Sequence, residues 1–293
     1  MNRSADSNTS LRIALQKEGR LTDQTLRLLE GIGLRFDNYK RSLMLKCRNF
    51  DVELLLIRDD DIPEYVQDGV CDLGFVGANV TAEMGADVTR LRGLDYGVCR
   101  LSLAAKKEGE IQSVVDFNGK TIATSYPNLT RRFLEDREVE ASIVTISGAV
   151  EIAPRLKVAD AICDLVSTGN TLKANGLEEI ETIFESETEL IRTNKELSEG
   201  KKKLIGKLLV RIEGYQHAER SRYIMMNAPE SAVSEIKEII PSLKSPTVMP
   251  LADDGMVAVH TVIPIEQFWD VMEQLKGAGA SGIVILPIES MIV

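Results

Sequence analysis

One stretch, Ala161–Leu177, restricts the possible fold more than any other part of the chain. It opens with the apolar run Ala161–Val166, which is typical of a buried strand, continues as Ser-Thr-Gly-Asn-Thr, and then reaches residues that can start a helix. Backbone N–H groups, hydroxyl donors and the positive end of a helix dipole converge in such a turn. The carboxylate of Asp164, just before the turn, would bind sugar hydroxyls or help to hold a metal. The pattern predicts an α/β fold with a sugar-phosphate site. The same pattern also fits an ordinary strand-to-helix turn that is capped by Thr or Asn and binds no ligand.

A second strand-turn-helix pattern lies near the N-terminus. The strand-like run Leu11–Leu15 is followed by Gln-Lys-Glu-Gly-Arg, and Thr22 or Asp23 can then cap a helix. Lys17 and Arg20 would place two cations beside the N–H groups of this turn. The two readings that remain open are an anion-binding loop and a pair of solvated loop charges.

A third pattern follows the strand-like run Asp51–Ile57. Arg58 stands at the carboxyl end of this strand, which is the edge where ligands bind in open α/β sheets. Three aspartates then precede Pro63. Carboxylates and an early proline are favoured in the first turn of a helix, so capping explains at least one aspartate more simply than a metal cluster does.

The pattern of the stretch Ala161–Leu177 occurs a second time in the chain. Val70–Gly77 repeats its order of apolar strand, Asp-Leu and glycine turn. We infer two α/β lobes of similar build that face a shared cleft, which is a natural place to bind a polar ligand; coincidence in so short a match is the alternative. In the second lobe, Tyr126 follows the strand Thr121–Ser125, and Ser147–Arg155 is predicted to open another helix.

The last part of the chain has a different pattern. From residue 222 onward the order of predicted elements is strand, helix, strand, strand, helix, strand, namely Tyr223–Asn227, Glu230–Ile240, Thr247–Leu251, Met256–Ile263, Ile265–Leu275 and Ile283–Leu286. This βαββαβ order is that of a ferredoxin-like domain. The order is specific for the fold and says little about function.

Composition narrows the classes of function. The 293 residues suffice for two or three domains, and the net charge of −10 argues against binding to nucleic acid or to an anionic membrane. Four scattered cysteines without a C-x-x-C pattern favour reduced core thiols in a cytoplasmic protein. With two histidines in the chain, a His-based metal site or a Ser-His-Asp triad is disfavoured.

The N-terminal segment and the hydropathy pattern bear on localisation. Residues 1–10 are polar and lack the apolar core of a signal peptide, so we expect a disordered tail. No apolar run reaches the length of about 18 residues that a membrane span needs.

Taken together, these motifs resemble the ATP phosphoribosyltransferase family in its long, self-regulated form. The strongest match, Asp164-Leu165-Val166-Ser167-Thr168-Gly169-Asn170-Thr171-Leu172, resembles the family's phosphoribosyl-pyrophosphate loop. Supporting matches are Gln16-Lys17-x-Gly19-Arg20-Leu21, Arg58-Asp59-Asp60-Asp61-Ile62-Pro63, Asp72-Leu73-Gly74, Ala123-Thr124-Ser125-Tyr126-Pro127, Gly148-Ala149-Val150-Glu151-Ile152-Ala153-Pro154-Arg155 and Ser245-Pro246-Thr247-Val248-Met249-Pro250-Leu251.

The resemblance implies a domain organisation and an activity. It implies a two-lobed, periplasmic-binding-protein-like catalytic core, with lobe I at 11–98 and 187–221 and lobe II at 99–186, and a ferredoxin-like regulatory domain at 222–293. The implied reaction joins ATP to phosphoribosyl pyrophosphate with Mg²⁺ and releases pyrophosphate, as the first step of histidine biosynthesis. Feedback inhibition by histidine and by AMP, and dimers that convert to hexamers, are also implied.

The resemblance further implies roles for individual residues. Glu151, Asp164 and Arg58 are the expected catalytic residues, and Asp164, Ser167, Thr168, Gly169, Asn170 and Thr171 are expected to bind phosphoribosyl pyrophosphate. Expected ATP contacts are Gln16, Lys17, Gly19, Arg20, Asp72, Leu73, Gly74 and Tyr126. Expected histidine contacts are Asn227, Leu243, Thr247 and Gly282. Magnesium is expected on the substrate phosphates, with no protein ligand assigned.

Two other classes of function fit the same architecture. A non-catalytic two-lobed binding protein is disfavoured because the sequence shows neither a signal peptide nor a helix-turn-helix ahead of the lobes. A phosphoribosyltransferase that acts on another base is the second alternative.

Overall fold

The computed structural model of the chain describes residues 10–36, 42–240 and 245–292. The chain forms two compact units, one of residues 1–27 and 34–201 and the other of residues 28–33 and 202–293. The tail expected at residues 1–10 lies outside the described residues except for Ser10.

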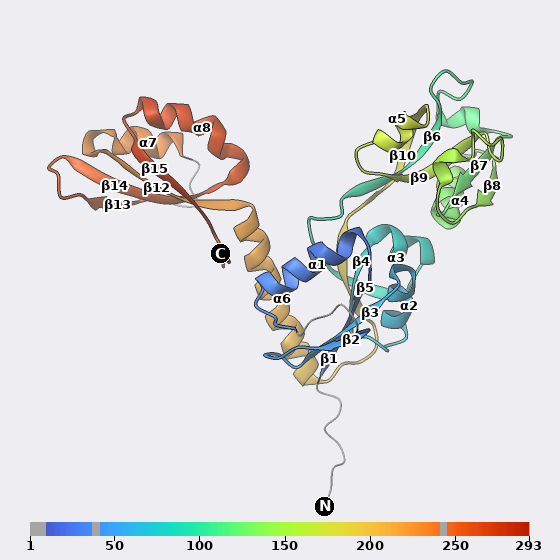
Figure 1. Cartoon of the computed structure of the whole chain (residues 1–293), viewed down its shortest axis with the longest axis horizontal. Helices are drawn as coiled ribbons and strands as arrows, with labels where there is room; N and C mark the ends of the chain where they lie inside the picture. The colour runs from blue at the N-terminus through green and yellow to red at the C-terminus, as the bar shows by residue number, and fades with distance from the viewer. Residues whose placement is uncertain (1–9, 37–41, 241–244, 293) are drawn as a thin grey trace, which may run out of the picture. The chain divides into compact units, whose positions relative to one another are not determined.

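The first sheet of the larger unit, with its helices, is called lobe I (Figure 1). Its strands run in the order β2-β3-β1-β4-β11-β5. The strands are β1 (Leu11–Gln16), β2 (Met44–Lys46), β3 (Val52–Ile57), β4 (Leu73–Gly77), β5 (Val88–Gly93) and β11 (Thr188–Thr193). The helices are α1 (Arg20–Gly31), the 3-10 turn η1 (Asp59–Asp61), α2 (Ile62–Gln67) and α3 (Ala78–Met84). All five residues of β4 are buried, because this apolar strand lies in the middle of the sheet.

The register of lobe I brings several strand ends to one edge. β1 runs parallel to β3, with Gln16 opposite Ile57, and also parallel to β4, with Leu15 opposite Phe75. The residues that follow β1 and β3, namely Lys17 and Arg58, therefore lie at the same carboxyl edge as the start of α3. The N–H of Lys17 donates to the carbonyl of Ile57 at 2.8 Å, which holds the two loops side by side.

The second sheet, with its helices, is called lobe II. Its strand order is β10-β6-β9-β7-β8. The strands are β6 (Cys99–Lys106), β7 (Thr121–Thr124), β8 (Ser142–Thr145), β9 (Ala161–Val166) and β10 (Leu177–Ser186), and the helical elements are η2 (Val114–Phe117), α4 (Pro127–Asp136), η3 (Val150–Ile152) and α5 (Asn170–Ala174). Fully buried Leu101, Leu103 and Phe117 form its core. The two α/β lobes predicted from the sequence are confirmed.

One predicted helix of lobe II is absent. Ser147–Arg155 forms only the three-residue η3 followed by turns. Gly148, Ala149 and Lys157 all adopt positive φ values, of 80°, 51° and 59°. Because an α-helix needs negative φ throughout, Gly148 and Ala149 exclude a helix that begins at Ser147, and Lys157 interrupts the segment that follows η3.

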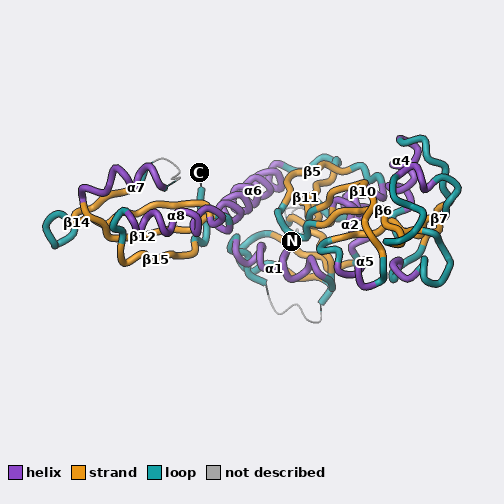
Figure 2. The backbone as a smooth tube through the Cα atoms, turned by 90° about the horizontal axis from the view of Figure 1, so that it is seen from above, coloured by secondary structure: helices purple, strands orange, loops and turns teal. Residues whose placement is uncertain are grey.

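The smaller unit contains most of α6 (Glu199–Glu219), which Figure 2 shows as one unbroken helix. The remaining elements are β12 (Ser221–Pro229), η4 (Glu230–Ala232), α7 (Val233–Ile239), β13 (Thr247–Pro250), β14 (Met256–Pro264), α8 (Ile265–Gly277) and β15 (Ser281–Pro287). The antiparallel sheet has the order β13-β14-β12-β15, which confirms the ferredoxin-like domain. Within the described ranges, no helix is both long and apolar enough to cross a membrane.

Candidate functional site

Tyr126 lies where the two lobes meet. It directly precedes α4 of lobe II, and its Oη accepts a 3.0 Å hydrogen bond from Nδ2 of Asn79 in α3 of lobe I. Burial raises the pKa of the Tyr126 phenol above its ordinary value, and the negative charges of Asp164, Asp59 and Asp60 add to the rise. Negative charges of both lobes therefore act on this hydroxyl group.

Asp164 and Glu151 form an acidic pair in lobe II. Asp164 lies in β9, and its Oδ1 accepts a 2.8 Å hydrogen bond from the N–H of Leu165. Burial raises the pKa of Asp164, and the charge of Glu151 in η3 raises it further. The structure thus brings together two predicted catalytic residues that are 13 positions apart in the sequence.

The predicted phosphate loop follows β9 directly. Residues 167–169 separate β9 from α5, and the side chains of Ser167, Thr168, Asn170 and Thr171 are exposed. Gly169 is the N-cap of α5 and has a φ of 76°, which glycine adopts without strain. Because Gly169 has no side chain, the N-cap residue does not compete with a ligand for the first N–H groups of the helix.

Arg100 supports this loop from β6. Its Nη1 donates to the carbonyl of Ser167 at 3.3 Å, and its Nε and Nη2 each donate to Glu179 at 2.5 Å. The hydrogen bonds from Arg100 are the largest cause that lowers the pKa of Glu179, to about 2. The sequence analysis did not identify either residue, because they lie on paired strands 79 positions apart.

The N-terminal loop places its cations at the carboxyl edge of lobe I. Lys17 and Arg20 are exposed, and Arg20 is the first residue of α1. Gly19 has a φ of 146°, and a Cβ there would lie 2.5 Å from Nε2 of Gln16. Glycine is therefore required for the side chain of Gln16 to fold over the loop. Arg58, also exposed, follows β3 at the same edge.

Asp72 lies at the opposite edge of lobe I. Both of its carboxylate oxygens lie 2.9 Å from Nζ of Lys201, and Oδ2 accepts a 2.9 Å hydrogen bond from the N–H of Arg12. Leu73 and Gly74 are buried in β4, where a Cβ on Gly74 would lie 2.7 Å from Cγ2 of Ile62. This placement makes the three residues part of the lobe I core, so we leave them out of the proposed ATP site.

The two Asp-Leu motifs, although similar in sequence, therefore occupy different positions relative to their strands. Asp72 and Asp164 each stand six residues before a helix, at Ala78 and Asn170. In lobe I the strand fills the whole interval, whereas in lobe II the interval includes the loop 167–169. Asp72 consequently lies before the start of its strand, whereas Asp164 lies near the end of its strand.

The three aspartates after Arg58 form η1. The three aspartates occupy the first turn of η1, and Pro63 lies in the first turn of α2, as expected for a helix start, although neither N-cap residue, Arg58 or Asp61, makes a side-chain capping hydrogen bond. Burial and the charge of Asp59 raise the pKa of Asp60. Among the described residues, no group of three or more His, Cys, Asp or Glu side chains is arranged to hold a metal ion.

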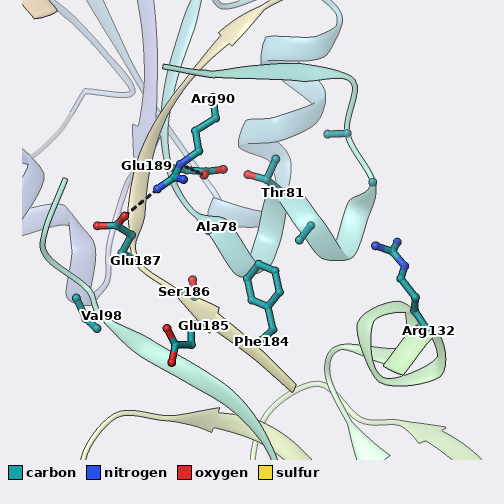
Figure 3. Close-up of a pocket in the computed structure, with 13 residues that line it drawn as sticks. Ala78, Thr81, Arg90, Val98, Arg132, Phe184, Glu185, Ser186, Glu187 and Glu189 are labelled. Atoms are coloured by element: carbon teal, nitrogen blue, oxygen red, sulfur yellow. Dashed lines mark hydrogen bonds and ion pairs between the residues drawn. The ribbon is translucent and has the colours of Figure 1, made fainter. Parts of the chain in front are cut away.

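A pocket of about 800 Å³ is lined by residues of both lobes, among them Arg90 of β5 in lobe I and Arg132 of α4 in lobe II, and it contains none of the predicted site residues (Figure 3). Arg90 bridges Glu187 and Glu189 at 2.8 and 3.2 Å on one side of the pocket. Burial raises the pKa of Glu189, and Arg90 opposes that rise. The charges in this pocket thus largely pair with one another.

The expected histidine contacts lie on the sheet of the smaller unit. Asn227 of β12 and Gly282 of β15 are neighbours, since a Cβ on Gly282 would lie 3.6 Å from Nδ2 of Asn227. Thr247 in β13 is exposed and pairs with His260 of β14. Leu243 lies outside the described residues.

Comparison with known proteins agrees with this architecture. A family model described as "ATP phosphoribosyltransferase" matches residues 58–214, and one described as "HisG, C-terminal domain" matches residues 218–290. Proteins named ATP phosphoribosyltransferase from Parabacteroides distasonis and Bacteroides fragilis are 48% and 46% identical to this chain, and each alignment covers 97% of this chain and 100% of the relative.

Solved structures show the same fold. The ATP phosphoribosyl transferase (HisG:HisZ) complex from Thermotoga maritima matches with a TM-score of 0.60 and 30% identity, over 69% of this chain and 98% of that chain. The structure of Tv2483 bound to L-arginine matches with a TM-score of 0.50 and 15% identity, over 72% of this chain and 87% of that chain, and shows similarity of fold alone.

Proposed function

The chain belongs to the ATP phosphoribosyltransferase family, and from that membership we propose that it condenses ATP with 5-phosphoribosyl 1-pyrophosphate. The products are 1-(5-phosphoribosyl)-ATP and pyrophosphate, and the reaction is the first step of L-histidine biosynthesis. The observation that carries the proposal is the family match over nearly the whole chain, and the hydrogen bond from Asn79 of lobe I to Tyr126 of lobe II joins the two lobes at a predicted site residue.

The phosphoribosyl pyrophosphate half of the site belongs to lobe II. Ser167–Thr171 would bind the 5-phosphate through N–H groups and hydroxyls, which suit a phosphate. Asp164 and Glu151 would accept hydrogen bonds from the ribose hydroxyls, because carboxylates are strong acceptors for such donors. The support of the loop by Arg100 keeps these donors in place before the substrate arrives.

The ATP half belongs to the carboxyl edge of lobe I. Lys17, Arg20 and Arg58 would bind the triphosphate or the pyrophosphate, with Gln16 and Gly19 shaping the loop. Tyr126 would border the adenine or the ribose from lobe II. A phenol that belongs to lobe II and contacts Asn79 of lobe I can contact both substrates.

The reaction depends on the positioning of the two substrates more than on a proton transfer before the adenine nitrogen attacks. Nitrogen 1 of the adenine ring has a free lone pair, so it forms the bond to the anomeric carbon as the bond to pyrophosphate breaks. Holding the two substrates in line lowers the barrier by proximity, and cations stabilise the negative charge on the leaving group. No residue has to act as a base before this step.

Magnesium fits the donor set of the site. The carboxylates of Asp164 and Glu151 are hard oxygen donors, and Mg²⁺ commonly takes one or two carboxylates together with substrate phosphates and waters. When bound, the ion would neutralise charge on the pyrophosphate.

We also propose regulation and assembly for the chain. Histidine would bind the 222–293 domain near Asn227, Thr247 and Gly282 and inhibit the core, with AMP as a second inhibitor. The core would be divided as 11–98 and 187–221 for lobe I and 99–186 for lobe II. The chain would form homodimers that convert to hexamers, and would act in the cytoplasm.

One assay tests the activity. ATP, phosphoribosyl pyrophosphate and Mg²⁺ are mixed with the protein and pyrophosphatase, and near-ultraviolet absorbance is followed. We expect a rise as phosphoribosyl-ATP accumulates and no rise when either substrate is omitted. Tight binding of ligands without a rise would favour the two-lobed binding protein, and a product with another base would favour the other phosphoribosyltransferase.

A further inference from the structure

A chain of hydrogen bonds links Ser186, at the end of β10, through Asn79 to Tyr126. Ser186, the last residue of β10, donates its hydroxyl hydrogen to Oδ1 of Asn79 at 2.8 Å. The N–H of Asn79 donates to Oγ of Ser186 at 3.0 Å, and Nδ2 of Asn79 donates to Oη of Tyr126 at 3.0 Å. Asn79 and Ser186 are 5% and 4% exposed, so water does not compete for these bonds.

The pattern of donors fixes the orientation of the Asn79 amide. Oδ1 accepts from the Ser186 hydroxyl, and a reversed amide would lose that bond and leave the hydroxyl hydrogen of buried Ser186 without this acceptor. The NH₂ group is therefore directed at Tyr126. Since Oη of Tyr126 accepts this bond, the hydrogen of the phenol is directed away from Asn79 and stays available as a donor.

The backbone of Tyr126 is held separately from its hydroxyl. Oγ1 of Thr130 donates to the carbonyl of Tyr126 at 2.7 Å. At the start of α4, the N–H groups of Asn128 and Leu129 donate to the Glu83 carboxylate at 2.8 and 2.9 Å. None of these contacts involves the Asn79 side chain, whose hydrogen bond to Tyr126 is made at the hydroxyl group.

We infer that Asn79 is a positioning residue, which holds Tyr126 so that its hydroxyl donates a hydrogen bond to the bound substrate. Ser186 completes the arrangement by fixing the amide of Asn79. The inference rests on the proposed function, because Tyr126 borders the substrates only if the site is the one proposed. It assigns a role to two buried polar residues that no predicted motif includes.

A double-mutant cycle tests the inference with the full-length chain. Asn79→Ala and Tyr126→Phe are made singly and together, and kcat and KM are measured for both substrates. We expect Asn79→Ala to lower kcat/KM about two- to tenfold, the effect of one hydrogen bond, in the wild-type background. In the Tyr126→Phe background the same substitution should have less than a twofold effect, because the hydroxyl that Asn79 directs is gone.

Asn128→Ala is the matched control. It removes a 3.1 Å hydrogen bond from Nδ2 of Asn128 to the carbonyl of Glu83, between the same two helices, and does not contact the phenol. Its effect on kcat/KM should be small and equal in both backgrounds. If Asn79→Ala fails to fold, as its melting curve would show, Ser186→Ala takes its place in the cycle with a weaker effect of the same kind.

The outcomes separate the two hypotheses. Product from the wild type, with equal losses from Asn79→Ala in the two backgrounds, overturns the inference and leaves the proposed function standing. No loss from Asn79→Ala in an active wild-type background also overturns it. Absence of product from the wild type refutes the proposed function, and the inference falls with it.

Discussion

Replacing Lys201 by methionine tests whether Asp72 stabilises lobe I or binds substrate. The side chains of Asp72 and Lys201 are 6% and 10% exposed, and Nζ lies 2.9 Å from both carboxylate oxygens. Methionine keeps most of the apolar stem of lysine but leaves the carboxylate buried without its cation. Removing one partner of a buried ion pair costs about 3–5 kcal/mol.

The expected loss of stability is large enough to detect by thermal unfolding. For a unit of this size each kcal/mol lowers Tm by about 2–4 °C, so the Lys201→Met variant should melt roughly 6–20 °C below the wild type. Asp72→Asn combined with Lys201→Met should recover part of this loss, because it removes the buried charge while an amide oxygen still accepts from the N–H of Arg12. Lys203→Met, an exposed position on the same helix, should change stability by less than about 0.5 kcal/mol.

The measurements are thermal unfolding by circular dichroism and the KM for ATP at a temperature where all variants are folded. We expect the KM for ATP to stay at the wild-type value in Lys201→Met. A raised KM for ATP with an unchanged Tm would refute the reasoning and return Asp72 to the ATP site.

Three further predictions follow from the site and the domain. Thr168→Ala with Thr171→Ala should raise the KM for phosphoribosyl pyrophosphate, at roughly 1.5–3 kcal/mol for each charge-assisted hydrogen bond lost, and an unchanged KM would remove the loop from the site. The lowered pKa of Glu179, about 2 against 4.5 for the free group, means that its contribution to stability is present above pH 4.5 and lost as the pH falls toward 2. Urea titrations should therefore show Glu179→Gln less stable than the wild type at pH 7, with a gap that closes at low pH; a constant gap would contradict this. Asn227→Ala should weaken inhibition by histidine without changing kcat, and full inhibition would place the effector elsewhere.

Local sequence was sufficient for most strands and helices and for one loop of the proposed site. The apolar run of β9 and the hydroxyl-rich turn after it are neighbours in the chain, so their pattern predicts a strand that ends in a phosphate-type loop. The βαββαβ order of the last domain was likewise predicted from local patterns of apolar residues, each about ten residues long. A local pattern failed where backbone conformation overrode it, as at Gly148 and Ala149, whose positive φ values exclude the predicted helix.

Only the tertiary structure decided which groups surround the two acidic residues of the repeated motif. Asp72 and Asp164 have the same local motif, yet Asp72 lies before the start of β4, against Lys201, whereas Asp164 lies near the end of β9, where the charge of Glu151 acts on it. Contacts between distant segments decide the rest: Asn79 and Tyr126 are 47 positions apart, and Asn79 and Ser186 are 107 apart. Strand register and the meeting of the lobes create these pairs, and neither is encoded in any short stretch of the chain.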